Sequence, residues 1–217
     1  VNIFSLIMFW DSPFNKVIGG MGMDIYTAIK KERFNLKIFF ITMSIISIIL
    51  PIAVVLTNLT TVFYLCYLGV VELLIVISII IRLNYYKVMY RCSNNKLIFK
   101  TGIFTKENLI ICDKVALVHT NKSDYDLEIV IITSVKFKNK ALRKIEKNFF
   151  RRYPQMEKEY NYIKKMNPEK EYYFQVIRRG GLKKYLLLDL IYKNCVKATY
   201  TEESIQNIKI ARGQTIV

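Results

Sequence analysis

The chain has 217 residues, of which 53% are hydrophobic, and its 33 Lys and Arg against 17 Asp and Glu give a formal net charge of +16. This length leaves room for a membrane segment and one soluble domain of moderate size. The four cysteines include no Cys-x-x-Cys pair, which excludes the usual zinc motifs and a disulfide-stapled scaffold and favours reduced thiols in a cytoplasmic compartment.

The N-terminal segment, residues 1–37, is predicted to be cytoplasmic or to lie on the membrane surface. Its apolar run at 1–10 is too short to cross a bilayer and has no basic residue ahead of it, so it is a poor signal peptide. Two interpretations of the first twenty residues stay open: a short surface helix, or a natural start at Met21 or Met23. Residues 24–37 are predicted to form a short helix whose basic side chains lie among lipid headgroups.

Two apolar stretches, 38–57 and 62–81, are each twenty residues long and contain a single charged residue in total, Glu72. A helix needs about 20 apolar residues to cross the roughly 30 Å hydrocarbon core of a bilayer. Only four residues separate the stretches, so we predict a transmembrane helical hairpin over 38–81. Basic residues flank the hairpin on its outer sides and its turn has none, which predicts a cell-membrane protein with two spans and both termini in the cytoplasm.

Glu72 is the candidate polar contact inside the membrane. An ionisable side chain in a span costs about 2.5 to 3.5 kcal/mol on insertion scales, so such a residue usually has a purpose. One interpretation is a hydrogen bond to the other helix or a contact in an oligomer. The other is ion or proton handling, for which Pro51 in the first span offers a kink.

Residues 82–217 have the pattern of a cytoplasmic domain made of short strands and turns. Strands are predicted at 84–91, 97–101, 103–104, 109–111, 115–118 and 127–135. A helical segment follows at about 138–166, and then two strands, 172–177 and 183–190, around a turn at Gly180 and Gly181. The chain is predicted to end with a strand at 196–200 and a helix at about 201–212 that Thr201 caps. Short strands at such close spacing favour an antiparallel sheet or barrel.

Part of this domain carries the pattern of a known family. The residues are Asn95-Lys96-Leu97-Ile98, then Thr101-Gly102-Ile103-Phe104, then Ile111 followed by Asp113-Lys114-Val115. Together with the preceding hairpin, this order resembles bacterial pleckstrin-homology-like membrane proteins. The resemblance implies an α+β fold, with a two-helix transmembrane hairpin followed by an antiparallel pleckstrin-homology-like β-sheet or barrel and a C-terminal helix. The helical segment at 138–166 is an insertion that the family does not normally carry, and the family implies no catalytic residues.

The segment 136–152 is the strongest positive signal, with eight basic residues against one acidic residue, Glu146. A Lys or Arg close to anionic headgroups gains about 1 kcal/mol, and Phe149 and Phe150 are expected to insert at the interface. The candidate lipid-surface contacts are Lys140, Arg143, Lys144, Lys147, Arg151 and Arg152. Other interpretations stay open: a solvated face of a helix packed on the sheet, or a coding bias toward Lys in an AT-rich genome. Nucleic acid is not favoured, because no RNA- or DNA-binding motif frames the charge.

Motifs for catalysis and for cofactors are missing from the sequence. The chain has one histidine, His119, and no glycine-rich loop of the kinds that hold nucleotide phosphates, so we predict no metal, no cofactor and no enzyme. The leading hypothesis is a non-enzymatic membrane-anchored adaptor or scaffold whose cytoplasmic domain binds a protein partner or the anionic membrane surface. The predicted partners are the lipid bilayer and either a protein partner or a second copy of the chain. The alternative is an accessory subunit of a membrane transport or secretion complex that uses the hairpin.

Overall fold

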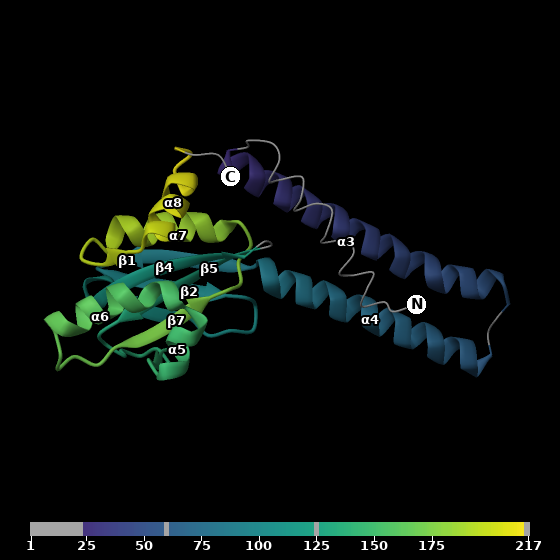
Figure 1. Ribbon diagram of the computed structural model, residues 1–217. Coiled ribbons are helices and arrows are strands. Elements are labelled where there is room, and N and C mark those ends of the chain that lie inside the picture. Colours follow the sequence, from purple (N-terminus) through teal and green to yellow (C-terminus); the bar gives the residue numbers. More distant parts are fainter. Residues whose placement is uncertain (1–23, 59–60, 124–125, 215–217) are drawn as a thin grey trace.

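The computed structural model describes residues 24–58, 61–123 and 126–214. It is an α+β structure in which two long helices project from a head made of sheets and shorter helices (Figure 1). The predictions for residues 1–20 lie outside the described residues, as does the middle of the predicted hairpin turn.

The two long helices are α3 (Ile25–Leu56) and α4 (Val62–Tyr86), which form an antiparallel pair (Figure 1). Each is long and apolar enough to cross a membrane, and only 6% of its most apolar 18 residues are buried. The core helix of a soluble protein would bury most of such residues. The lead-in helix predicted at 24–37 is the first part of α3, which runs on without a break.

Two contacts set the register of the helix pair. Ser47 Oγ donates to Glu72 Oε2 at 2.5 Å, and the Arg82 guanidinium lies 5.2 Å from the centroid of the Phe39 ring. The second contact brings the start of one apolar stretch beside the end of the other. The stretches 38–57 and 62–81 therefore lie level with each other along the hairpin.

The head contains two sheets. The first is antiparallel, with the order β1-β2-β3, and its strands are β1 (Val88–Ser93), β2 (Lys96–Thr101) and β3 (Asn108–Ile111). The 3₁₀ helix η1 (Cys112–Lys114) leads to the second sheet, which has the order β6-β7-β5-β4-β8 and one parallel pair, β4–β8. Its strands are β4 (Val115–Ser123), β5 (Asp126–Thr133), β6 (Arg143–Lys144), β7 (Tyr173–Ile177) and β8 (Thr199–Tyr200).

Strand β5 is the centre of the head because both of its faces are buried. Ile129 and Ile131 belong to the core that α7 (Lys183–Asn194) and α8 (Glu202–Ala211) complete. Val130 and Ile132 pack into a second core with α5 (Lys147–Arg152), the 3₁₀ helix η2 (Pro154–Met156) and α6 (Glu157–Met166), and Figure 1 shows the two helical layers on either side of the sheet. Where both faces of a strand are covered, successive positions are apolar, which explains the run of β-branched residues at 129–132.

The strand predicted at 183–190 is wrong, because these residues form the first part of α7. The buried positions Lys184, Leu187, Leu188 and Ile191 are spaced i, i+3, i+4 and i+7, which is one face of a helix. The helical pattern is hard to recognise in the sequence because the first of these buried positions, Lys184, is a charged residue.

Other boundaries also differ from the prediction. The helix expected from residue 138 begins only at Lys147, after turns and the two-residue strand β6. Residues 103–104 form bends, whereas β3 confirms the strand at 109–111. The expected C-terminal helix is confirmed as α8. Thr201 occupies its N-cap position, but its hydroxyl makes no capping hydrogen bond and lies 2.9 Å from His119 Nδ1 instead.

Buried charges join the hairpin to the head where α3, α4, β5 and α7 meet. The side chain of Lys184 is fully buried and pairs with Asp126, whose carboxylate also accepts the Tyr85 hydroxyl from the end of α4. Glu32 on α3 accepts the Leu182 N–H at 3.1 Å, at the start of α7. A buried ammonium without a partner is costly by several kcal/mol, so Lys184 holds Asp126 in place within the head. The Tyr85 and Glu32 contacts then join this site to the two long helices.

Two glycines let the head approach the hairpin closely. Gly181 has a φ of 53°, and a Cβ at this position would lie 2.5 Å from Glu32 Oε1 and 2.8 Å from Tyr86 Cδ1. Gly180 donates its N–H to the Tyr85 carbonyl at 2.8 Å. The sequence pattern predicts the tip of a β-hairpin here, whereas the pair forms the surface on which the long helices rest.

Glu32→Gln is expected to remove a pH dependence from the stability of the protein. Burial raises the pKa of Glu32 from 4.5 to about 7, so the folded protein holds this proton more tightly than the unfolded chain. Between about pH 4.5 and 7 the free energy of unfolding therefore falls as the pH rises, by up to about 3 kcal/mol, and it levels off above this range. Thermal unfolding of the full-length protein in mild detergent across this range measures the slope.

The matched control is Glu107→Gln, which changes an exposed carboxylate of the head and should leave the slope unchanged. A slope in Glu32→Gln equal to that of the native protein would show that another group causes it.

Candidate functional site

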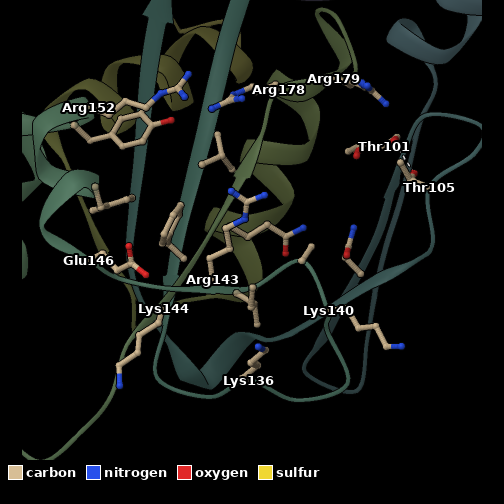
Figure 2. Close-up of a pocket in the computed structure, with 18 of the residues that line it drawn as sticks. Thr101, Thr105, Lys136, Lys140, Arg143, Lys144, Glu146, Arg152, Arg178 and Arg179 are labelled. Atoms are coloured by element: carbon tan, nitrogen blue, oxygen red, sulfur yellow. Dashed lines mark hydrogen bonds between the residues drawn. The ribbon is translucent and has the colours of Figure 1, made fainter.

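An open groove of about 1120 Å³ crosses the head between the β2–β3 loop, the segment that connects β5 to α5, and the end of β7 (Figure 2). Basic side chains dominate its walls, and Glu146 is the only acidic lining residue in the described chain. The basic lining residues are Lys106, Lys136, Lys140, Arg143, Lys144, Arg152, Arg178 and Arg179. This is the charge pattern of an anion-binding site.

Asn139 holds the basic segment between the two sheets. Its side-chain nitrogen donates to Gln175 Oε1 of β7 at 2.8 Å and to the Leu109 carbonyl of β3 at 3.2 Å. Its side-chain oxygen accepts the Ala141 N–H at 2.9 Å. This one buried amide therefore sets the path of the loop that carries Lys140 and its neighbours.

Carboxylates neutralise some of the cations in the groove. Arg178 and Arg152 both approach Glu128 Oε1, at 2.9 and 3.6 Å. Lys144 pairs with Glu171 at 2.5 Å, but both side chains are exposed and such a pair contributes little to stability.

Five lining residues have no such partner. Within the described part of the chain, no carboxylate lies within ion-pair distance of Lys106, Lys136, Lys140, Arg143 or Arg179. These five positive charges repel each other when the groove is empty. An anion that enters the groove is attracted by each of them and also relieves this repulsion. The arginines among them can bind a phosphate or a carboxylate through two parallel hydrogen bonds.

Four of the six predicted lipid contacts line this groove, namely Lys140, Arg143, Lys144 and Arg152 (Figure 2). Arg151 is exposed on α5 but does not line the groove. Lys147 begins α5, and its side chain lies outside the described atoms. Glu72 is in the hairpin, where its partner is Ser47.

The expected insertion of Phe149 at a membrane interface is wrong, because its ring is buried in the head. Its centroid lies 4.4 Å from that of Phe174. Phe150 packs on Tyr160, with 5.0 Å between the ring centroids. Phe149 and Phe150 therefore pack in the core, as the interpretation of a packed segment predicts, while several cations of the segment line the groove.

Sequence reasoning missed Lys106, Arg178 and Arg179. The pattern places the two arginines in a hairpin turn and Lys106 between strands, all distant from 136–152 in the chain. They reach the groove because β7 pairs with both β5 and β6, and because Asn139 ties the basic segment to β3. The one feature of the sequence that could have indicated their role is the Arg178-Arg179 pair directly after a predicted strand.

His119 does not belong to the groove. It is buried on β4 with its Nδ1 2.9 Å from Thr201 Oγ1, and burial lowers its pKa, which is the setting of a structural histidine. Among the residues that the structure describes, no group of three or more His, Cys, Asp and Glu is suited to hold a metal ion. The described lining of the groove contains neither histidine nor cysteine, and its eight Lys and Arg side chains suit the binding of anions.

Three cysteines that are scattered in the sequence come together beside η1. Cys92 Sγ lies 3.9 Å from Cys112 Sγ, and Cys195 follows α7 into the same core. The hydrogen bond from Cys195, with a second from Cys92, lowers the pKa of the Cys112 thiol to about 7. Cys112 and Cys195 are fully buried, and the three thiols lie apart from the groove.

Comparison with known proteins finds no matching family model, no matching curated protein and no matching solved structure. The resemblance to pleckstrin-homology-like proteins therefore stays a prediction. The function has to be inferred from the geometry and charge of the site itself.

Asn139→Ala is expected to loosen the basic segment. The substitution removes three hydrogen bonds and leaves buried polar groups of its partners unsatisfied, which should lower the free energy of unfolding by about 1 to 3 kcal/mol. Amide hydrogen exchange at 136–142 should become several-fold faster. Asn148→Ala changes an exposed asparagine of the same groove and serves as the control. Native exchange rates in Asn139→Ala would contradict the anchoring role.

Proposed function

We propose that the protein is a non-enzymatic membrane-anchored adaptor whose head binds anionic lipid headgroups of the bilayer that holds its hairpin. The observation that carries this proposal is the groove, in which five cations lack carboxylate partners within the described chain. Lipid phosphates are the anions nearest to a head that is joined directly to two membrane-spanning helices.

The groove begins close to the end of the hairpin. Helix α4 ends at Tyr86 and β1 begins at Val88, so no flexible linker separates the head from the long helices. Thr101 and Thr105 line the groove, and Gly102 between them donates its N–H to the carbonyl of Lys87 at 2.6 Å. Figure 2 shows both threonines at one end of the groove. This end is the part of the groove nearest to the proposed membrane.

The energetic requirement for binding is modest. A Lys or Arg near an anionic surface gains about 1 kcal/mol. The hairpin already keeps the head beside the surface, so the groove does not have to bear the entropy cost of bringing it from solution. A few unpaired cations are then enough for the head to prefer anionic over neutral lipid, and added salt should weaken this preference by screening.

We place both termini in the cytoplasm because the basic flanks of the hairpin lie on the side of the head. An acidic protein segment is the competing occupant of the groove. A transport or secretion subunit has less support, because the hydrogen bond from Ser47 gives Glu72 a structural use within the hairpin.

We further propose that the head is a divergent pleckstrin-homology-like module. Support comes from residues 85–118, which run from the end of α4 through β1, β2 and β3 into β4 in the order that the resemblance implies. Helix α8 also agrees with the C-terminal helix that the resemblance implies. The departures from the expected pattern are helix α7 after β7 and the parallel strand β8.

Hydrogen exchange of the full-length protein in lipid nanodiscs tests the groove. With about a third of the lipid anionic, amides at 136–144 should exchange several-fold more slowly than in neutral phosphatidylcholine, and salt should remove the difference. Lys140→Glu combined with Arg143→Glu should abolish the protection. Lys158→Glu combined with Lys165→Glu makes the same charge change at exposed sites on α6, on the side of the head away from the hairpin (Figure 1), and should preserve it.

Equal exchange in the two lipids would overturn the proposal. If a polyglutamate peptide then protected the same amides in neutral nanodiscs, the groove would be assigned to an acidic protein segment instead.

A further inference from the structure

The β2–β3 loop, residues 102–107, presents an aromatic side chain to the outside of the head. Phe104 is 75% exposed, and Lys106 follows two residues later. A single exposed aromatic residue on a soluble surface needs no explanation. Phe104 differs from such a residue because its loop lies beside the end of α4 and is hydrogen-bonded to it.

The loop is tied to the end of α4. Ile103 donates its N–H to Asn84 Oδ1 at 2.8 Å, and Gly102 donates to the Lys87 carbonyl at 2.6 Å. Gly102 has a φ of 95°, and any Cβ at this position would collide with Asn84. The Thr105 hydroxyl closes the loop by donating to the Thr101 carbonyl at 2.6 Å. The loop is thus held at a defined height along the helix.

Helix geometry gives that height. The apolar stretch of α4 ends at Ile81, and a rise of 1.5 Å per residue places Asn84 about 5 Å beyond it. The headgroup layer on each side of the hydrocarbon core is about 5 to 7 Å thick. Arg82, which lies over the rings of Phe39 and Tyr86 at 5.2 and 5.3 Å, is of the type found at this level. Asn84 and the loop tied to it therefore fall within the headgroup layer.

We propose that Phe104 is an interfacial anchor, whose ring inserts at the boundary between headgroups and acyl chains of the leaflet where α4 ends. Lys106 remains among the phosphates, which is the usual arrangement of apolar and basic side chains at an interface. The inference rests on the proposed function for placing the hairpin in a membrane. It does not depend on anionic lipid, because burial of an apolar ring requires no lipid charge.

Single-tryptophan variants of the full-length chain test the anchor. Trp10→Phe removes the only native tryptophan, and Phe104→Trp then places an indole in the loop. In neutral phosphatidylcholine nanodiscs this indole should emit at shorter wavelength than the indole of Tyr162→Trp, an exposed site on α6. Lipids brominated near the top of their acyl chains should quench it at least about twofold more than this control, whatever the salt concentration.

Quenching no stronger than that of the control would overturn the anchor. Because Phe104 is largely exposed, the exchange of one aromatic ring for another should leave the fold intact, which the thermal unfolding midpoint verifies. Strong quenching without lipid-dependent protection of 136–144 would support the anchor and refute the lipid-binding groove. Lipid-dependent protection of 136–144 without strong quenching would support the lipid-binding groove and refute the anchor.

Discussion

The buried ion pair between Lys184 and Asp126 is the contact on which the arrangement of this molecule depends. It sits where both long helices meet the head: Tyr85 of α4 donates to Asp126, and Glu32 of α3 accepts the nearby Leu182 N–H. A pair of this kind often adds little net stability, because removing two charges from water costs about as much as their attraction returns. Its value here is geometric, because Lys184 holds the Asp126 carboxylate where the Tyr85 hydroxyl of α4 donates to it, and another docking of the head would break this contact and the one between Glu32 and Leu182.

A head held in one orientation determines which of its surfaces face a membrane. The start of β1 directly after α4 and the loop tied to Asn84 bring one edge of the first sheet to the end of the hairpin. The basic groove begins at that edge and continues across β7 toward α5. Eight basic side chains of the head are thus gathered in one groove that begins near the hairpin, and under the proposed function they face the nearest lipid phosphates.

Secondary-structure elements could be predicted from the sequence where a short stretch of residues carries the pattern by itself. Two long apolar runs mark α3 and α4, the β-branched run marks β5, and Thr201 with two following glutamates marks the start of α8. Helix α7 could not be predicted, because its buried stripe begins with Lys184, whose burial makes sense only once Asp126 is beside it. The two-residue strand β6 has no local signal either, since it depends on Asn139 bridging two strands.

Only some of the groove residues could be predicted from the sequence, again because the signal is local. The run 136–152 stands out by charge, and four of its predicted contacts line the groove. Arg178, Arg179 and Lys106 join them only through strand pairing and loop packing, which a single sequence does not encode in any short window. The prediction for Phe149 failed because an aromatic residue among cations suits an interface and a core equally well, and only the position of Phe174 decides between them.

Paramagnetic relaxation of the backbone amides by gadolinium-chelating lipids, with the full-length protein in nanodiscs, tests this orientation most directly. The strongest relaxation in the head should fall on residues 102–107 and 136–144, and the weakest on α6. Uniform relaxation over the head, or relaxation strongest on α6, would contradict a head that the contacts of Tyr85 and Glu32 hold with its groove toward the bilayer.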